Sequence, residues 1–256
     1  MLKKYGPYAL VAGGSDGLGA AFSRELAKRG FNLVILARRK EKLEALAQDL
    51  AGRYHVRVIP HAADAGDFAS VKAFVEGLDA EIGLLVYNAA FAPVGPFTEI
   101  SGDSLSQAVA VNVRGPLLLA RLLAPGMIER KRGGIVLMSS LAGTQGSPRL
   151  SVYAATKAFN TVLAEGLWEE LRPFGIDVTA SCPGAILTPG YERTQSAGAP
   201  GTLTAEAVAE ATLNALGKGP VCVPGLVNKL ARFFMMRLMP RKGAIKIMAA
   251  NTRSLS

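Results

Sequence analysis

Tyr153 and Lys157 stand four residues apart in the stretch Ser-Val-Tyr-Ala-Ala-Thr-Lys, which reads as the start of a helix. In a helix, this spacing places both side chains on one face. A phenol has a reference pKa of about 10, and a neighbouring ammonium group lowers that pKa by stabilising the phenolate. The pair could therefore exchange a proton with a substrate oxygen. Tyr and Lys at this spacing also occur on solvated helix faces, so the interpretation needs supporting residues.

Three other features precede this pair in the chain. A glycine-rich turn, Gly-Gly-Ser-Asp-Gly-Leu-Gly at residues 13–19, follows a short apolar run. Asn112 lies in a long apolar segment, and Ser140 ends another apolar run thirteen residues before Tyr153. A glycine turn, an Asn, a Ser and a Tyr-x3-Lys pair in this order resemble the classical short-chain dehydrogenase/reductase family. The resemblance covers residues 8–224.

The resemblance implies catalytic roles for Asn112, Ser140, Tyr153 and Lys157. Ser140 would hydrogen-bond a carbonyl oxygen, and Tyr153 would give or take its proton. Lys157 would lower the pKa of Tyr153 and hold the nicotinamide ribose. Asn112 would hold a water that connects the lysine to solvent. Judged from the residues alone, Asn112 could instead hydrogen-bond the backbone of its own helix.

The resemblance also implies a set of cofactor contacts. Glycines at positions 13, 17 and 19 allow a sharp turn and bring backbone N–H groups close to a pyrophosphate at a helix N-terminus. The alternative is that the turn only connects a strand to a helix. The full implied set is Gly13, Ser15, Asp16, Gly17, Leu18, Gly19, Arg38, Arg39, Asp64, Asn88, Ala89, Tyr153, Lys157, Pro183, Gly184, Ile186 and Thr188.

Some positions depart from the family pattern. Ala12 stands where the family usually has Thr before the glycine turn. After the fourth predicted strand, the family usually shows Asn-Asn-Ala-Gly, whereas this chain has Tyr87 and Ala90 around a retained Asn-Ala centre. We expect a structural turn beside the cofactor at this point.

The end of the second predicted strand indicates which nicotinamide cofactor binds. An acidic side chain there binds the ribose 2′-OH, whereas an arginine suits the 2′-phosphate. The run Asn32–Ala37 has no acid at its end and continues with Arg38, Arg39 and Lys40. The sequence therefore favours NADP(H) over NAD(H). Asp16 argues against this, because some NADP-preferring relatives carry a basic residue there, and the basic run could simply be a solvated helix start.

Apolar strands alternate with helical periodicity along the chain. The predicted strands are residues 8–12, 32–37, 56–61, 84–87, 134–138, 177–181 and 221–223. The predicted helices are residues 20–29, 41–51, 68–78, 104–130, 151–174 and 204–216, the fourth interrupted near Gly115-Pro116 and Pro125-Gly126. Parallel strands need such crossover helices. We therefore predict one α/β domain: a Rossmann-like, doubly wound parallel sheet of about seven strands with helices on both faces.

Two segments lack a clear place in this fold. Residues 184–201 are rich in Gly, Pro, Ala, Thr and Ser, and we expect a lid over the substrate. Residues 226–256 form a second segment beyond the catalytic domain of residues 1–225, and they carry seven basic and no acidic residues, +7 of the chain's +9 charge. This basic, apolar extension could pack on its own domain, on a partner subunit or on an anionic membrane surface.

Composition narrows the function further. Two cysteines cannot form a disulfide framework, and the two histidines have no partners that suggest a metal site. No signal peptide and no run of about 18 apolar residues is evident, so we expect a cytoplasmic protein, which could also contact a membrane peripherally. No nucleic-acid recognition motif is present. The family resemblance implies a homodimer or homotetramer.

The prediction is an NADP(H)-dependent oxidoreductase that interconverts a carbonyl and a secondary alcohol, acting on CH–OH donors. Its substrate would be a small apolar carbonyl or alcohol, lipid-, acyl- or steroid-like. The alternative is a nucleotide-binding scaffold or sensor that keeps this fold and has lost catalysis.

Overall fold

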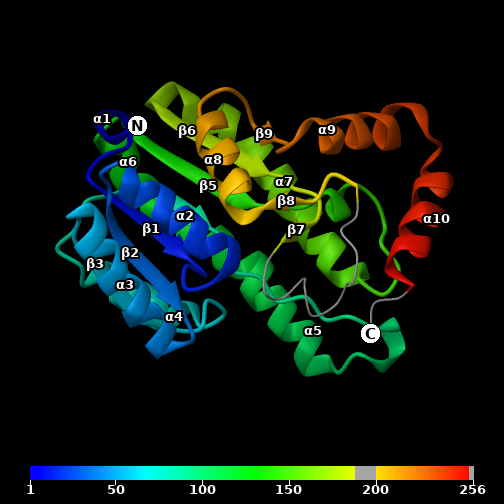
Figure 1. The fold of residues 1–256 in the computed structure, drawn as a ribbon, viewed down its shortest axis with the longest axis horizontal. Helices are drawn as coiled ribbons and strands as arrows, with labels where there is room; N and C mark the ends of the chain where they lie inside the picture. Colours follow the sequence, from blue (N-terminus) through cyan, green and yellow to red (C-terminus); the bar gives the residue numbers. More distant parts are fainter. Residues whose placement is uncertain (188–199, 254–256) are drawn as a thin grey trace.

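A seven-stranded parallel sheet forms the centre of the protein, in the order β3-β2-β1-β4-β5-β6-β9 (Figure 1). The structure, a computed structural model, describes residues 1–187 and 200–253. The strands of the sheet are β1 (Tyr8–Ala12), β2 (Asn32–Ala37), β3 (Val58–Ala62), β4 (Ile82–Tyr87), β5 (Gly133–Met138), β6 (Ile176–Ser181) and β9 (Val221–Cys222). Two short strands, β7 (Ile186–Leu187) and β8 (Leu203–Thr204), pair separately. The predicted fold class is confirmed.

The order of the strands reverses between β1 and β4. From β1 the chain moves outward through β2 and β3, then crosses back to place β4 on the other side of β1. In such open sheets, ligands bind at the carboxyl ends of the strands, where the order reverses. The glycine turn after β1 and the segment after β4 therefore lie at the expected ligand edge.

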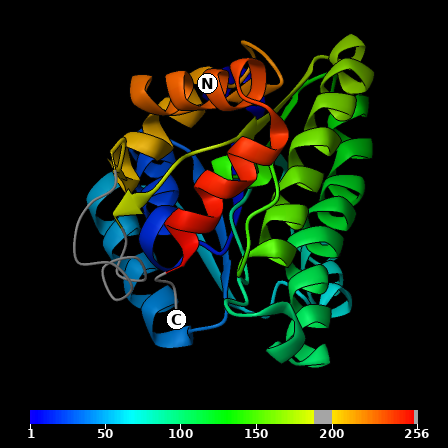
Figure 2. The ribbon, with the colours of Figure 1, turned by 90° about the vertical axis from the view of Figure 1, so that its right-hand side faces the viewer.

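Helices cover both faces of the sheet (Figures 1 and 2). One face carries α2 (Gly17–Lys28), α3 (Lys40–Tyr54) and α8 (Ala205–Ala215). The other carries α4 (Phe68–Glu76), α6 (Gly115–Glu129) and α7 (Ser151–Leu171). The remaining helices are α1 (Leu2–Tyr5), α5 (Gly102–Val109), α9 (Leu226–Phe233) and α10 (Arg241–Thr252).

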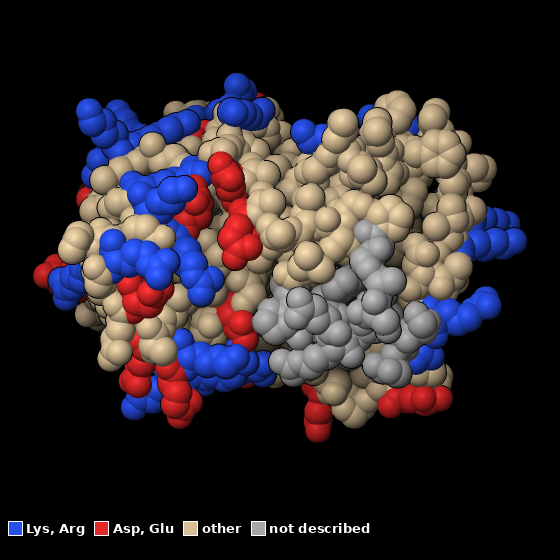
Figure 3. All heavy atoms as spheres, viewed as in Figure 1, with Lys and Arg blue, Asp and Glu red and all other residues tan. Residues whose placement is uncertain are grey.

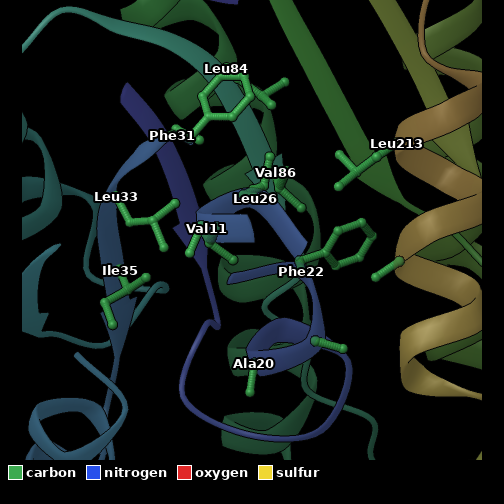
Figure 4. Close-up of a cluster of buried hydrophobic side chains, with 14 of the residues drawn as sticks. Val11, Ala20, Phe22, Leu26, Phe31, Leu33, Ile35, Leu84, Val86 and Leu213 are labelled. Carbon is green, nitrogen blue, oxygen red and sulfur yellow. The ribbon is translucent and has the colours of Figure 1, made fainter. Parts of the chain in front are cut away.

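The apolar runs become strands because the helices bury both of their faces. All five residues of β1 and all six residues of β4 and of β5 are buried. Figure 4 shows Phe22 and Leu26 of α2 among Val11, Ile35 and other strand residues. Burying one such side chain stabilises the fold by about 1.5 to 3 kcal/mol. These contacts fix α2, and with it the glycine turn, against the sheet.

The long predicted helix has one interruption, not two. A single turn of π-helix at Ala110–Arg114, which we call the π-turn, separates α5 from α6 near the predicted Gly115-Pro116 break. The second predicted break is wrong, because α6 continues through Pro125 to Glu129. Pro125 removes one helix hydrogen bond, but packing of α6 on β4 and β5 holds the helix together. By length and composition Gly102–Glu129 could also cross a membrane, and part of it is buried against the sheet.

The C-terminal segment consists of α9, a π-turn at Phe234–Leu238 and α10. It lies at the end of the molecule opposite β3 (Figure 1). Asn228 fixes the start of α9, because its amide donates to the carbonyls of Gly201 and Pro224, both at 3.0 Å. Ala244 and Thr252 are the buried residues of α10. The division into residues 1–225 and 226–256 stays a prediction.

Candidate active site

The glycine turn lies against the segment that follows β4. Gly13 has a φ of +79°, and a Cβ on it would lie 2.7 Å from the Ala89 backbone nitrogen. A Cβ on Gly19 would lie 1.8 Å from the Gly13 carbonyl oxygen, and Asn88 Nδ2 donates to this oxygen at 3.0 Å. Neither glycine tolerates a side chain. The glycines thus shape the turn by close backbone packing.

The first turn of α2 begins earlier than predicted. Asp16 is the N-cap residue, and its carboxylate accepts a hydrogen bond from the Gly17 N–H at 2.8 Å. Gly17, Leu18 and Gly19 are therefore helical residues rather than part of the preceding turn. The positive end of the helix dipole lies at this turn, where it favours a phosphate group.

A cleft of about 300 Å³ opens in front of this turn. It contains eight of the predicted cofactor residues: Gly13, Ser15, Asp16, Arg38, Arg39, Asp64, Asn88 and Ala89. Leu36, Ala37, Ala63, Ala65, Ala90, Phe91 and Val111 complete the lining. The cleft joins the carboxyl ends of β1, β2, β3 and β4, which is where this fold binds a dinucleotide.

Charged side chains gather at the β2 end of the cleft. Asp16 accepts hydrogen bonds from Arg39 Nη2 at 2.8 Å and from Lys42 Nζ at 2.9 Å. These cations, Lys42 foremost, hold the pKa of Asp16 at about 2. Arg38 is exposed in the cleft and forms no ion pair with any residue that the structure describes. Lys42 was missed from the sequence because only the folded helix α3 brings it to Asp16.

Asp64 is held by groups on two sides of the cleft. Its carboxylate accepts from the Gly66 N–H at 2.7 Å and from Gln107 Nε2 at 3.2 Å. Gln107 belongs to α5, so Asp64 links the end of β3 to that helix. This fixes the side wall of the cleft.

Tyr153 and Lys157 lie on one face of α7, as their spacing predicts. Lys157 is 3 % exposed, its Nζ donates to the Met138 carbonyl at 2.8 Å, and it lies 5.4 Å from the centre of the Tyr153 ring. Burial lowers the pKa of Lys157 to about 8. Burial raises the pKa of Tyr153, and a hydrogen bond with Ser140 acts in the opposite direction. The lysine charge and the phenol are thus within electrostatic reach in a site largely shielded from water.

Ser140 follows the end of β5 by two residues. It caps the short 3-10 helix Leu141–Thr144, and its Oγ accepts from the Ala142 N–H at 3.2 Å. A Cβ on Gly143 in that helix would lie 2.7 Å from the Ala158 nitrogen of α7. This close contact brings Ser140 next to Tyr153.

A buried polar network beneath the pair was not predicted. Ser139 Oγ donates to the Lys157 carbonyl at 2.7 Å and lies 2.7 Å from Thr161 Oγ1. Asn160 Nδ2 donates to the same Met138 carbonyl as Lys157, at 3.2 Å. These bonds tie α7 to the end of β5. The only signal for this network in the sequence is Ser139, which directly precedes Ser140.

Asn112 is fully buried in the π-turn. Its amide exchanges hydrogen bonds with the backbone of Phe91 at 2.7 and 2.8 Å and donates to Thr156 Oγ1 at 3.1 Å. The alternative that Asn112 bonds its own helix backbone is wrong, because its partners lie in the segment after β4 and in α7. Its role in proton supply stays a prediction.

Tyr87 explains one departure from the family pattern. The Tyr87 hydroxyl donates to the Val111 carbonyl in the π-turn at 2.6 Å. A Cβ on Gly115 would lie 1.9 Å from the same hydroxyl oxygen. The glycine therefore makes room for the tyrosine, and the tyrosine holds the π-turn that carries Asn112.

The segment after β6 lies on the far side of the site. The Pro183 carbonyl accepts from the Leu141 N–H at 2.9 Å, which ties this segment to the loop after Ser140. Gly184 approaches Asn228, whose Oδ1 would lie 2.6 Å from an added Cβ. Ile186 belongs to β7. Thr188 and most of the predicted lid lie outside the described residues.

Comparison with known proteins decides the family. The short chain dehydrogenase family model matches residues 7–198, well over half of the chain. The chain belongs to the short-chain dehydrogenase family. Its members share the parallel sheet and the order of glycine turn, Asn, Ser and Tyr-x3-Lys on which the expectations above rest, so the family prediction is confirmed. The chain therefore belongs to a family of oxidoreductases.

Among the relatives of this chain, the chicken (Gallus gallus) hydroxysteroid dehydrogenase-like protein 1 is 37 % identical over 192 residues, 73 % of this chain and 58 % of that protein. Its human (Homo sapiens) counterpart, 35 % identical over the same shares, is named inactive. The very-long-chain 3-oxoacyl-CoA reductase of Aspergillus fumigatus is 35 % identical over 69 % of this chain and 54 % of that protein. The chain thus spans little more than half the length of these relatives.

Solved short-chain dehydrogenase structures match almost the whole chain. One, from work on 7β-hydroxysteroid dehydrogenase stereoselectivity, has a TM-score of 0.90 at 28 % identity, covering 96 % of this chain and 98 % of that chain. A Sphingobium yanoikuyae short-chain dehydrogenase in complex with NADPH has a TM-score of 0.80 at 31 % identity, covering 91 % and 96 %. A Brucella melitensis 3-oxoacyl-[acyl-carrier protein] reductase with bound NAD has a TM-score of 0.76 at 27 % identity, covering 86 % and 91 %.

Proposed function

We propose that this short-chain dehydrogenase interconverts a carbonyl and a secondary alcohol with NADP(H) as cofactor. One observation carries the proposal: a half-buried Tyr153 is hydrogen-bonded to Ser140 and lies beside the buried Lys157 at the carboxyl edge of the sheet. This arrangement provides a proton donor, an oxygen-positioning hydroxyl and a positive charge in one place.

The protein's residues have separate tasks in this reaction. The bound nicotinamide cofactor supplies or accepts the hydride. Ser140 orients the substrate oxygen by a hydrogen bond, and Tyr153 gives that oxygen a proton during reduction or removes one during oxidation. Lys157 stabilises the phenolate form of Tyr153 by its charge. Asn112 joins the segment after β4 to α7 by its hydrogen bonds to Phe91 and Thr156, and so holds these two walls of the site together.

The cleft residues fit a dinucleotide, and the charges support the phosphorylated form. The glycine turn and the N-terminus of α2 would hold the pyrophosphate. Arg39 and Lys42 pair with one carboxylate, Asp16, and Arg38 lines the cleft without an ion pair among the described residues, so the β2 end of the cleft keeps a positive balance. A 2′-phosphate suits this balance. Related structures hold NADPH or NAD, so the support for NADP(H) in this chain comes from these side chains.

The substrate class is part of the proposal. The relatives named as hydroxysteroid dehydrogenase-like proteins and very-long-chain 3-oxoacyl-CoA reductases support an apolar, steroid- or acyl-like carbonyl compound. Within this chain, α10 lies beside the loop that follows Ser140: a Cβ on Gly146 would lie 3.8 Å from Ile245 Cγ1. An apolar side chain, Ile245, beside the loop that follows Ser140 favours an apolar substrate.

The competing candidate is a nucleotide-binding scaffold without turnover, which the inactive human relative favours. The test is to follow NADPH oxidation by purified protein with a panel of steroid ketones and 3-oxoacyl thioesters. We expect turnover that Tyr153→Phe lowers by about 100-fold or more. Cofactor binding, followed as a rise in melting temperature, should persist in that variant.

The matched control is Tyr54→Phe, a half-buried tyrosine on α3, distant in the fold from the carboxyl edge of β5. Turnover at the wild-type rate in Tyr153→Phe would remove the assigned acid. A protein that binds NADPH but turns over none of the panel would favour the scaffold.

We propose a second copy of the chain as partner along α6 and α7. An apolar groove of about 540 Å³ lies between these helices, with Leu117, Leu163 and Leu167 in its lining. Val162 beside it is largely exposed. Figure 2 shows the two long helices side by side on the right of the molecule, where an identical pair could pack against them.

A further inference from the structure

The C-terminal helices expose an unusual number of large apolar side chains. We call this set the tail face. Eight of the seventeen exposed large apolar residues in the described chain belong to it, with exposed fractions between 42 and 71 %. They are Leu226, Val227, Leu230, Phe233, Phe234, Met236, Leu238 and Ile247. A cluster of this kind on one end of a protein marks a contact surface rather than scattered surface residues.

The same segment carries only positive charge. Its seven basic residues are Lys229, Arg232, Arg237, Arg241, Lys242, Lys246 and Arg253, and all but Arg232 are classed as exposed. None of them forms a salt bridge with a residue in the described part of the chain. Figure 3 shows no acidic side chain over α9 at the upper right of that view, with basic groups at its edge. The tail face is thus apolar at its centre and cationic around it.

Buried residues on the inner sides of α9 and α10 keep the apolar side chains of the tail face directed toward solvent. Asn228, on the opposite side of α9, is 4 % exposed and bonds the carbonyls of Gly201 and Pro224. Ala244 and Thr252 are the buried residues on the inner side of α10. Turning the apolar side chains of α9 inward would break the hydrogen bonds of Asn228, and turning those of α10 inward would expose Ala244 and Thr252.

Charge decides between the possible occupants. A second copy related by a two-fold axis would set one tail face against another, bringing +7 against +7 with no acidic residue from 226 onward to offset it. A nucleic acid would match the charge but not the exposed Leu and Phe side chains. An anionic lipid surface matches both, because acyl chains receive the apolar residues and headgroups pair with Lys and Arg.

We propose that the tail face binds the surface of anionic membranes, with α9 and α10 lying in the interface. Leu230 and Phe233 enter the headgroup region, and the flanking cations face anionic lipids. The inference is independent of the proposed catalytic function. It places the loop after Ser140, which lies against α10, close to the lipid surface.

Co-sedimentation of the full chain with vesicles tests the proposal. Vesicles of phosphatidylcholine alone are compared with vesicles that contain phosphatidylserine, at low and at high salt. We expect strong binding to the anionic vesicles, weak binding to the neutral ones, and a loss of binding at high salt, because salt screens the headgroup attraction.

Two variants identify the surface. Leu230→Asp/Phe233→Asp removes apolar contacts, and Arg237→Glu/Lys246→Glu reverses exposed charges; each should weaken anionic-vesicle binding by about tenfold or more. Matched controls elsewhere are Phe174→Asp and Lys218→Glu, which should bind as wild type. All altered residues are exposed, so circular dichroism and melting temperature should stay unchanged.

Three outcomes would overturn the proposal: absence of binding to anionic vesicles at low salt, equal binding by the tail variants and wild type, or a wild-type oligomer that Leu230→Asp/Phe233→Asp dissociates. The last result would assign the tail face to a second copy. In the first case, tight binding to a nucleic acid would assign the tail face to that partner instead.

Discussion

Lys157 shows how burial sets the properties of a single residue. The residue is almost fully buried, and its folded-state pKa of about 8 lies below the reference of 10.5. Between these two values the unfolded chain binds more protons than the folded one. The contribution of this group to stability therefore rises with pH from about 8 to 10.5, and its charged form is a cost to stability below pH 8.

This sign gives a stability prediction. Urea denaturation gives the unfolding free energies of wild type and of Lys157→Met. As pH rises from 7 to above 10, the value for wild type should increase relative to the value for the variant by about 3 kcal/mol. The control is Lys218→Met, an exposed lysine, for which the difference should not change with pH. A flat difference for Lys157→Met would mean that the lysine is not buried as a cation.

Arg38 carries a second prediction at this scale. Replacing it by Ala should weaken NADPH binding by about 10- to 100-fold, since a charge-assisted hydrogen bond contributes about 1.5 to 3 kcal/mol, and should leave NADH binding nearly unchanged. Lys40→Ala is the control, because Lys40 is exposed and does not line the cleft. Both affinities can be measured by fluorescence titration. Equal losses for both cofactors would show that Arg38 does not contact the 2′-phosphate.

The reactive residue types could be predicted from spacing, and their supports could not. Tyr153 and Lys157 are one helical turn apart, so local geometry alone pairs them. Ser139 and Lys42 act through partners that are 18 and 26 positions away in the chain. Side-chain bonds across such separations depend on tertiary packing, which residue order alone does not give.

The π-turn between α5 and α6 is the element that most affects the site. It carries Asn112 into contact with Phe91 and α7, and its Val111 carbonyl depends on the Tyr87 hydroxyl. An isolated helix would close this turn into regular α geometry. The tyrosine and the small Gly115 hold the wider turn in place.

Tyr87→Phe tests this dependence. The variant leaves the buried Val111 carbonyl without its hydroxyl donor, which should destabilise the protein by about 1 to 3 kcal/mol. Thermal denaturation measures the change, and Tyr54→Phe serves as the control because its hydroxyl has no partner among the described residues. Unchanged stability would mean that the π-turn persists without the tyrosine.

Element types followed from periodicity, whereas element ends depended on capping and packing. The apolar runs gave the strands because helices bury both sheet faces. The start of α2 was misplaced by three residues because Asp16 caps it from within the glycine turn. The break expected at Pro125 is absent because tertiary contacts outweigh one missing hydrogen bond.

At the scale of the whole molecule, two different surfaces are proposed as contact sites. The groove between α6 and α7 is lined mainly by apolar residues, with Arg121, Glu129 and Glu170 among them, and the tail face is surrounded by cations. The doubly wound parallel sheet with helices on both faces could be predicted, since parallel strands restrict the crossovers. The use of each surface could not, because exposed apolar residues look the same in a sequence as buried ones.

The groove carries the prediction at this scale. Sedimentation equilibrium of wild type should show a dimer or tetramer, and Leu117→Arg/Val162→Asp should shift it to a smaller species by placing charges in the apolar contact. Lys218→Glu, an exposed side chain just after α8 on the other face of the sheet, should leave the distribution unchanged. A wild-type monomer would remove the proposed partner.

Helix α10 contacts the loop after Ser140 on one side and belongs to the tail segment on the other. Ile245 packs beside Gly146 in that loop, on the same helix whose outer side carries Lys246 and Ile247. If a lipid surface and a ligand of the site favour the same arrangement of α10, each must tighten the binding of the other by the same factor. A molecule with its site occupied would then stay longer on the membrane than a molecule with its site empty.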